Sequence, residues 1–411
     1  MAARRHAPAT GIQAMWSEQK LVASDGNAQE WFGSWVEVDG DLALISAKNA
    51  TVNGRAGQGA VYLAARRSNG HWTIIQKIVA HDGEAGALFG SAVAFHDGIA
   101  IVTAPYATVA GKTWHGAAYF YTLVGSRLVM RQKIVPAGGV AFDSFGTAVA
   151  FNATSAFVGA GGVNRGGQYM PRKVYTFDFD PTQVGTPWMQ AQTLPAPVPD
   201  DPLSSFGGAI AMADDLALVG ARGSTLGLNV GQGIVYAYER RGAQWELVQK
   251  VTATDGAARD NYGISIATDG TTALIGAQGA TIEGRISNGA VYRLERGHTG
   301  WNEKQKLVPT PGGTTNLFGA SVRMAANTAL IGAYGADGYQ GAAYVFQKAA
   351  GTWKQTLRLQ AGDGANGDCY GYYTALDART AIVGAYTAKV GTNANQGAAY
   401  FYARPHFGSP G

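Results

Sequence analysis

The residues of this 411-residue chain best suited to chemistry stand where its internal repeats disagree with one another. They are Trp35, Glu37, Lys48, Arg323, Tyr334, Tyr372, Tyr373 and Tyr386. A carboxylate or a tyrosine can supply an acid–base pair of the kind that a lyase or a hydrolase uses. Aromatic faces with a few directed polar groups can equally bind a sugar or a polar peptide side chain. The choice between these chemistries depends on the elements that position the residues.

No established catalytic motif surrounds these residues. None of the seven histidines has a second histidine two or four positions away, so a helical or strand metal motif is absent. The chain also has no Gly-x-Ser-x-Gly, no phosphate-binding loop and no His-Glu-x-x-His. The single cysteine, Cys369, has no cationic neighbour in sequence, and we expect an unreactive thiol without a disulfide partner. Any catalytic site would have to be assembled from distant segments.

Composition excludes several classes of protein. The chain has 46% hydrophobic residues, and its 58 glycines are interspersed with valine, alanine and tyrosine, which indicates many short strands rather than disorder. The net charge of +4 is small and the basic residues are scattered, so no nucleic-acid partner is expected. No run of 18 apolar residues is present, so no membrane span is expected. Residues 1–14 contain two arginines without a following apolar segment, which predicts an N-terminal arm with no visible signal peptide.

One pattern repeats along the chain. A Phe-Gly or Tyr-Gly pair recurs at intervals between 52 residues (318 to 370) and 61 residues (145 to 206). The pairs begin at Phe32, Phe89, Phe145, Phe206, Tyr262, Phe318 and Tyr370. Each pair opens a strand-like run, followed by a turn, a second run such as "TALIGA", a variable loop, a third run such as "GAVY", and usually a fourth run of Trp, three residues and Gln-Lys. Seven units of four strands predict an all-β, seven-bladed β-propeller.

The two ends of the repeat pattern indicate how the ring closes. The seventh unit stops after its third strand, at 397–402, whereas an unpaired fourth-strand sequence precedes the first unit at 15–22. We therefore expect the N-terminal strand to complete the last blade and to remove an open sheet edge. The predicted domain is one propeller over 15–402, between the arm at 1–14 and a tail at 403–411. The fourth strands carry lysines that we expect to be solvated; they are Lys20, Lys77, Lys133, Lys250 and Lys306.

Comparison of the repeats shows why the eight residues named first belong together. The residues just after each Gly are mostly small, as expected where strands crowd near a propeller axis. The departures are Trp35, Glu37, Arg323, Tyr372 and Tyr373, in blades one, six and seven, which become neighbours when the ring closes. Lys48, Tyr334 and Tyr386 directly follow second strands, which places them at the same loop face. The alternative is that these aromatics only fill the axis, with Glu37 paired to Arg323.

The repeated phrase resembles the FG-GAP repeat over 15–402: Phe-Gly, a small residue, Val-Ala, then Gly-Ala before a long loop and Gly-Ala-Val-Tyr after it. Such repeats build the seven-bladed head of integrin α chains, some fungal and bacterial lectins and many bacterial surface proteins. The resemblance therefore implies an extracellular or cell-surface protein. Integrin-like members bind calcium through Asp-x-Asp-x-Asp-Gly loops, but the stretches "VDGDL", "ADDL" and "GADG" lack three alternating acids. We expect no cofactor, with calcium left open.

Three functions are open from the sequence. The expected function is a non-catalytic, monomeric recognition module that binds a glycan or a surface protein at the loop face of blades six, seven and one. The first alternative is a lyase or hydrolase in which Glu37, Arg323 and tyrosines act at the axial end of those blades. The second alternative is a structural scaffold without a small ligand. A multivalent lectin would repeat its site between blades, and these residues do not repeat.

Overall fold

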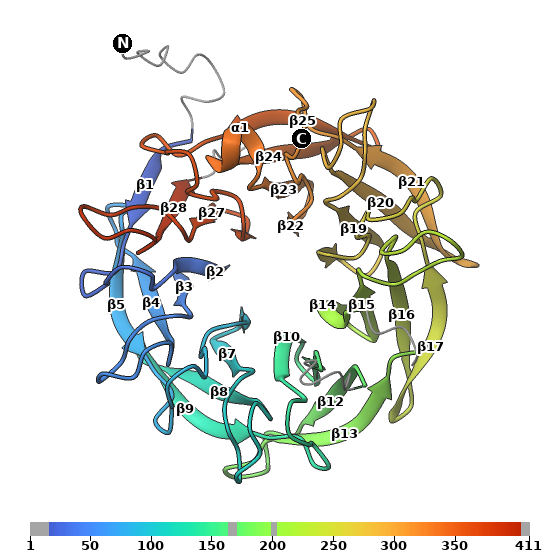
Figure 1. The fold of residues 1–411 in the computed structure, drawn as a ribbon. Coiled ribbons are helices and arrows are strands. Elements are labelled where there is room, and N and C mark those ends of the chain that lie inside the picture. The colour runs from blue at the N-terminus through green and yellow to red at the C-terminus, as the bar shows by residue number, and fades with distance from the viewer. Residues whose placement is uncertain (1–15, 163–170, 199–203, 404–411) are drawn as a thin grey trace.

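The protein forms a ring of seven antiparallel sheets around a central axis (Figure 1). The computed structural model describes residues 16–162, 171–198 and 204–403. Within these residues every blade has four strands, and the one helix is the four-residue α1 (Ala336–Tyr339). The expected all-β, seven-bladed propeller is therefore confirmed.

Each blade takes its strands in chain order from the axis outward, except the last. Blades 1 to 3 contain β2 (Phe32–Asp39), β3 (Leu42–Ala47), β4 (Ala60–Arg66) and β5 (Trp72–Ile78); β6 (Val93–His96), β7 (Ile99–Ala104), β8 (Ala117–Val124) and β9 (Arg127–Ile134); and β10 (Phe145–Phe151), β11 (Ser155–Ala160), β12 (Lys173–Phe179) and β13 (Trp188–Pro195). Blades 4 and 5 contain β14 (Phe206–Ala213), β15 (Leu216–Ala221), β16 (Ile234–Arg241) and β17 (Gln244–Val251); and β18 (Ile266–Thr268), β19 (Thr272–Ala277), β20 (Ala290–Gly297) and β21 (Gly300–Leu307). Blades 6 and 7 contain β22 (Ser321–Ala325), β23 (Thr328–Ala333), β24 (Ala342–Ala349) and β25 (Thr352–Leu359); and β26 (Thr374–Leu376), β27 (Thr380–Ala385), β28 (Ala398–Ala403) and β1 (Glu18–Leu21).

The N-terminal strand closes the ring, as the two ends of the repeat pattern predicted. β1 pairs antiparallel with β28, so that Glu18 lies opposite Tyr402. The order of this sheet is β1-β28-β27-β26. A parallel bridge between Phe32 of blade 1 and Gly397 of blade 7 joins the same two blades nearer the axis. Blade 7 therefore holds the first and the last strand of the chain together.

A buried aromatic pair in each blade explains two of the repeated motifs. The ring of the opening Phe or Tyr packs steeply inclined against the Tyr of the third strand, with centroids 5.3 to 5.7 Å apart, an arrangement that aromatic rings prefer. The pairs are Phe32–Tyr62, Phe89–Tyr119, Phe145–Tyr175, Phe206–Tyr236, Tyr262–Tyr292, Phe318–Tyr344 and Tyr370–Tyr400. The opening aromatic is fully buried in all seven blades. The hydrophobic cores thus lie within and between blades, and the axis is left to other residues.

The Gln of the fourth strand links each blade to the next. In blade 2, Gln132 Nε2 donates to the Trp188 carbonyl (2.8 Å) and Gln132 Oε1 accepts from the Trp188 amide (2.9 Å). The same two-bond contact is made by Gln19, Gln76, Gln192, Gln249 and Gln305. Between blades 6 and 7 the corresponding residue is Leu357, which belongs to a hydrophobic cluster with Trp16. Six of the seven boundaries are therefore joined by an amide that satisfies both backbone groups of one residue.

Four of the five fourth-strand lysines are paired, so the expectation that they are simply solvated is wrong. In blade 5, Lys306 Nζ lies 2.8 Å from Asp255 Oδ2, and the Tyr292 hydroxyl donates to Asp255 Oδ1 (2.7 Å). Equivalent trios are Asp25–Lys77–Tyr62, Asp82–Lys133–Tyr119 and Asp363–Lys20–Tyr400. Each trio ties the loop that enters a blade to the outer strands of that blade. Lys250 is exposed.

We expect acid to destabilise the protein through these trios. Burial raises the pKa of Asp255, but the hydrogen bonds from Lys306 and Tyr292 and the charge of Lys306 outweigh it and leave the pKa below the ordinary 3.8. Since the folded-state pKa is lowered, the stabilisation is complete above the ordinary pKa and is lost as the pH falls through the lowered value. Urea unfolding should give a lower free energy of unfolding near pH 3 than near pH 6. The Asp255→Asn variant should lose less over that interval, and an equal loss would contradict this role.

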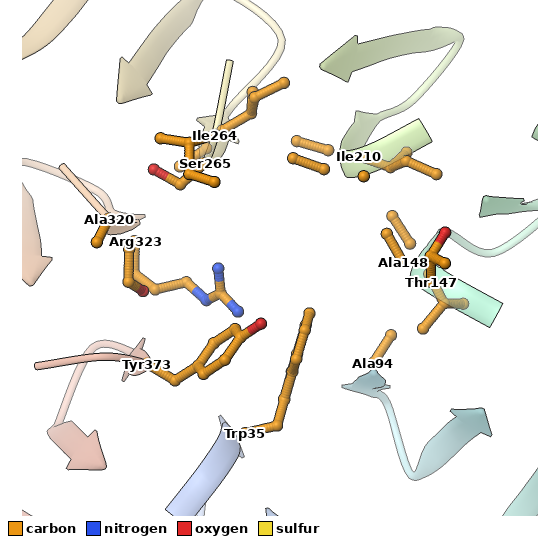
Figure 2. A pocket seen from close by; sticks show the side chains of 18 of the residues that line it. Trp35, Ala94, Thr147, Ala148, Ile210, Ile264, Ser265, Ala320, Arg323 and Tyr373 are labelled. Carbon is orange, nitrogen blue, oxygen red and sulfur yellow. The ribbon is translucent and has the colours of Figure 1, made fainter. Parts of the chain in front are cut away.

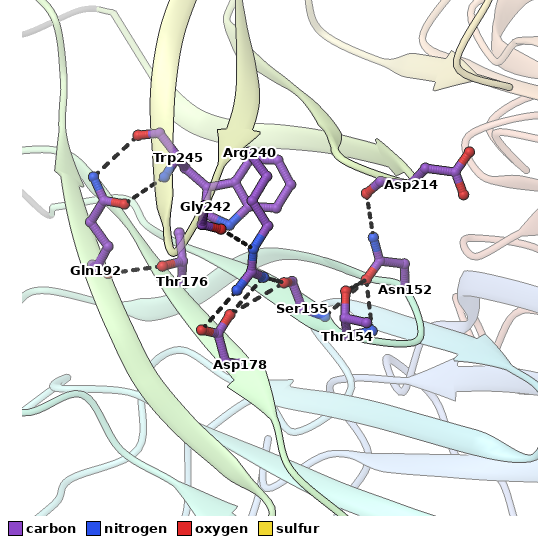
Figure 3. Close-up of polar contacts among 10 residues, drawn as sticks. All are labelled: Asn152, Thr154, Ser155, Thr176, Asp178, Gln192, Asp214, Arg240, Gly242 and Trp245. Atoms are coloured by element: carbon purple, nitrogen blue, oxygen red, sulfur yellow. Dashed lines mark hydrogen bonds and ion pairs between the residues drawn. The ribbon is translucent and has the colours of Figure 1, made fainter.

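The boundary between blades 3 and 4 departs from the repeat. Blade 3 has Arg172 where the other third strands are preceded by Gly. Figure 3 shows side chains that cross this boundary: Arg240 of β16 donates to both carboxylate oxygens of Asp178 on β12, at 2.9 and 3.1 Å. The Gln192–Trp245 contact lies in the same view. A bidentate arginine–carboxylate pair is stronger and more directional than a neutral hydrogen bond, so charged side chains reinforce this boundary.

Two further expectations concern the ends of the chain and membranes. The predicted arm at 1–14 lies outside the described residues, as does the predicted tail except for Ala403, the last residue of β28. In the segments that the structure describes, none of the helical residues forms a helix long and apolar enough to cross a membrane.

Candidate functional site

The axis of the propeller contains a cavity of about 580 Å³. Residues from all seven blades line it, and many are small, including Ala94, Ala148, Ala150, Ala209, Ala211, Ala267 and Ala320. Figure 2 shows that Trp35, Arg323 and Tyr373 extend into the opening, whereas short side chains such as Thr147 form the opposite wall. Cavities of roughly 300–1,000 Å³ commonly hold small ligands. The cavity is thus asymmetric and large enough for one or a few sugar units.

Glu37 and Arg323 form an ion pair inside this cavity. Arg323 Nη2 donates to Glu37 Oε1 at 2.7 Å, and Trp35 Nε1 donates to the same oxygen at 2.9 Å. The side chains of Arg323 and Glu37 are 25% and 19% exposed, so the pair is neither fully buried nor freely solvated. One carboxylate therefore holds both a guanidinium and an indole in place. The pairing matches the axis-filling alternative, but an open cavity is left beside the pair.

Five of the predicted aromatics form a continuous series of ring contacts from the cavity toward the loop face. Trp35 of β2 packs on Tyr373, with ring centroids 4.4 Å apart. Tyr373 adjoins Tyr372 at 5.1 Å, just before β26. Tyr372 in turn contacts Tyr334, after β23, at 4.9 Å and Tyr386, after β27, at 4.6 Å. The ring closure thus brings together side chains that are more than 300 residues apart in the sequence.

Lys48 and Tyr386 are not part of the cavity wall. The other six predicted residues line the cavity, and these two do not. Lys48 Nζ lies 5.8 Å from the ring centroid of Trp31, and Trp31 packs edge-on against Tyr386 at 6.2 Å. Burial lowers the pKa of Lys48. The aromatic series therefore ends beside a partly buried cation at the loop face.

Two arginines that the sequence analysis did not select, Arg172 and Arg222, also line the cavity. Arg222 follows β15, at the position that Lys48, Tyr334 and Tyr386 occupy in their own blades. That shared position is the signal by which the sequence could have identified it. Its blade 4 lies across the ring from blade 7, which carries Tyr386 (Figure 1). Arg222 is exposed and faces the cavity from the side opposite the aromatic sector.

Burial raises the pKa of the tyrosines in this sector. Burial and the neighbouring Tyr372 raise the pKa of Tyr334 to about 12, while the charge of Arg222 opposes the rise. Burial also raises the pKa of Tyr373, with the charges of Arg323 and Arg222 acting in the opposite direction. The Arg222 guanidinium therefore lies near enough to these rings for its charge to act on them. At neutral pH the hydroxyls are protonated and can donate hydrogen bonds.

The described acidic side chains offer few places where a metal ion could bind. Within the residues that the structure describes, one group of three side chains could hold an ion: Asp39, His96 and Asp97, in the turns that end the inner strands of blades 1 and 2. The acids of the loop that enters blade 5 do not fit a calcium site of the Asp-x-Asp-x-Asp-Gly type. Asp255 uses its two oxygens on a tyrosine and a lysine, and Asp260 Oδ2 accepts from the Ala257 amide at 2.8 Å. Calcium requires six to eight converging oxygens, which this arrangement does not offer.

The sequence matches the family model for the FG-GAP repeat over five segments. They are 16–64, 72–121, 245–294, 301–346 and 353–402, which together make up more than half of the chain. The protein therefore belongs to the FG-GAP repeat family. Each segment begins with the fourth strand of one blade and continues through three strands of the next. Blade 3, whose third strand is preceded by Arg172, lies outside the matches.

A solved structure with a similar fold is that of the periplasmic gluconolactonase PpgL from Pseudomonas aeruginosa. The TM-score is 0.50 and the sequence identity 14%, and the alignment covers 81% of this chain and 87% of PpgL. At this identity the similarity shows the fold alone. No match to a curated protein was found.

Proposed function

We propose that this protein is a recognition module that binds a glycan in the axial cavity, entering from the loop face. The observation that carries the proposal is the grouping of Trp35, Tyr373 and the Glu37–Arg323 pair in one sector of a cavity whose other walls are mostly short. Aromatic faces pack on the apolar faces of sugar rings, while the charged pair offers directed hydrogen bonds to hydroxyls. The sector occurs once in the ring, so the proposal is one specialised site.

A glycan fits this geometry better than a folded surface protein. The cavity has the volume of a small-ligand site, about 580 Å³, and its aromatic wall lies on the inner strands. A protein could reach Trp35 and Tyr373 only by inserting a side chain along the axis. A linear oligosaccharide could instead place one terminal sugar against Trp35 and Tyr373 and extend its other units over Tyr334 and Tyr386, which both contact Tyr372. We also propose an extracellular or cell-surface location, typical of the FG-GAP family, and a monomeric state.

A lyase or hydrolase function receives less support. A general base works best when its pKa lies near the working pH, but the pKa of Tyr334 is raised to about 12 and that of Tyr373 is also raised. Glu37 has one oxygen engaged by both Arg323 and Trp35. The name of PpgL describes a lactonase, but that similarity extends to the fold alone. A scaffold without a ligand would not need charged residues around an open cavity.

Binding to a glycan array tests the proposal. We expect the wild type to bind a subset of glycans and Tyr373→Ala to bind them at least about tenfold more weakly, because the exposed aromatic wall is lost. Trp114→Ala is the matched control: Trp114 is a loop aromatic that packs on Tyr106 at 5.1 Å and does not line the cavity. This control should retain binding. No glycan binding by the wild type, or unchanged binding by Tyr373→Ala, would reject the proposed site.

A further inference from the structure

Arginines outnumber carboxylates among the residues that line the axial cavity. The described lining residues include three arginines, Arg172, Arg222 and Arg323, and one carboxylate, Glu37. The single carboxylate already contacts Arg323 at 2.7 Å. Lys48 adds a further positive charge beside Trp31, which packs on Tyr386. A neutral sugar would leave Arg222 without a counter-charge among the described residues.

Arg222 is the cation most available to a ligand. It is exposed, and no acidic side chain of the described residues pairs with it. Four acids of the described connecting loops, Asp25, Asp82, Asp255 and Asp363, are engaged elsewhere, since each pairs with a lysine. Arg222, Tyr372 and Tyr373 line the same cavity, and the charge of Arg222 opposes the rise in pKa that burial causes in both tyrosines. A sugar packed on Tyr373 would therefore present its outer substituents to Arg222.

The opposite mouth of the axis has the opposite charge. The turns between first and second strands surround it. They carry seven aspartates and one arginine: Asp39, Asp41, Asp97, Asp214, Asp215, Asp269, Asp377 and Arg379. Neighbouring turns are in contact: Asp39 Oδ2 accepts from the Asp97 amide at 2.7 Å, and Asp377 Oδ2 accepts from the Gly40 amide at 3.1 Å. The field along the axis thus favours entry of an anion from the loop face and disfavours entry from the turn face.

We propose that the ligand is an acidic glycan, a uronate-containing oligosaccharide whose carboxylate binds Arg222 while its sugar ring packs on Tyr373 and Trp35. The inference rests on the proposed function and names the class of glycan. A guanidinium can bind a carboxylate through two parallel hydrogen bonds, which a lysine cannot reproduce. The Tyr372 hydroxyl can donate to the same carboxylate. The positive charge of Arg323 partly neutralises Glu37 and so weakens the repulsion between Glu37 and the carboxylate of the ligand.

The test compares trigalacturonate with its fully methyl-esterified form, in which each carboxylate is replaced by a neutral methyl ester. We expect the wild-type chain, measured by isothermal titration calorimetry, to bind trigalacturonate at least about tenfold more tightly than the ester. The preference should shrink as the salt concentration rises. Arg222→Gln should abolish the preference, and Arg222→Lys should retain part of it. The matched control is Arg127→Gln, an exposed arginine at the start of the outermost strand β9, which should keep the full preference.

The outcomes separate this inference from the proposed function. Equal wild-type affinity for the two probes, or array binding to neutral glycans alone, overturns the acidic ligand and leaves glycan recognition standing. A preference that survives in Arg222→Gln, with an unchanged melting temperature, overturns the role of Arg222. Array binding confined to carboxylated glycans supports the inference even when trigalacturonate itself is not the preferred ligand. Failure of both probes and of every glycan on the array overturns the proposed function itself.

Discussion

Replacing Gly116 by alanine is expected to lower the free energy of unfolding by about 3 kcal/mol or more, or to prevent accumulation of soluble protein. Gly116 precedes β8 and forms a parallel bridge with Phe145 of the next blade. Its φ is +89°, and a Cβ there would lie 2.1 Å from the carbonyl oxygen of Phe145 and 2.5 Å from its amide nitrogen. Backbone atoms cannot give way as a flexible side chain can, so blades 2 and 3 would have to move apart.

The same loop supplies the control. Gly111 has a φ of +76°, and a Cβ at this position would meet nothing within 4 Å. Gly111→Ala therefore introduces the left-handed backbone strain without the collision, and should cost about 1 kcal/mol. Urea and thermal unfolding of the two variants measure the difference. Equal losses would show that backbone conformation alone requires glycine and would contradict the contact between blades.

The collision explains why glycine opens the third-strand motif. A Cβ would lie 2.0 to 2.2 Å from the carbonyl oxygen of the next opening aromatic at Gly59, Gly233, Gly289, Gly341 and Gly397 as well. Blade 3, with Arg172 at this position, is the exception. This exception was visible in the sequence as "RKVY", but its consequence for the cavity was not, because the direction of a long side chain is set by the packing around it.

The fold could be predicted from the sequence because the same types of residue pack in the same way in every blade. The 30-residue spacing of Phe89 and Tyr119 recurs in six of the seven blades and reflects one buried ring pair, and the missing and extra fourth strands identified the closure. Side-chain contacts between blades could not be predicted in this way. The partners Gln132 and Trp188 are 56 residues apart, and the sequence does not show which backbone groups lie opposite the side-chain amide of a glutamine.

The candidate site could likewise be predicted only in part. Trp35, Glu37 and Tyr373 could be selected because their size or charge departs from small residues at fixed positions of the repeat. Arg222 could not be selected by that criterion, because the position after the second strand is not restricted to small residues. Only its place at the position of Lys48, Tyr334 and Tyr386 could have identified it. Its importance follows from the width of the cavity, across which blade 4 faces blade 7, and from the absence of an acidic partner among the described residues.

Glu37→Ala is expected to lower both the stability of the protein and its affinity for the ligand. The change removes the acceptor of two hydrogen bonds, from Arg323 at 2.7 Å and from Trp35 at 2.9 Å. The partly buried guanidinium is then left without a carboxylate, which should cost about 1–3 kcal/mol. A double-mutant cycle with Arg323→Ala should give a coupling of about 1–2 kcal/mol. The control is the pair Arg241 and Glu246, 60% and 52% exposed, whose coupling should stay below about 0.5 kcal/mol.

Measurements of ligand affinity show whether the Glu37–Arg323 pair contributes to a binding site or only fills the axis. A pair that only fills the axis would change the free energy of unfolding when it is broken and leave the affinity for trigalacturonate, or for a glycan found on the array, as it is in the wild type. We expect the affinity to fall at least about tenfold in Glu37→Ala, because Trp35 loses the hydrogen bond that fixes its ring against Tyr373. Glu37→Gln keeps an oxygen that can accept from Trp35 Nε1 while losing the charge that holds Arg323. It should therefore recover most of the affinity but little of the coupling, and recovery of neither would reject Glu37 as the residue that positions Trp35.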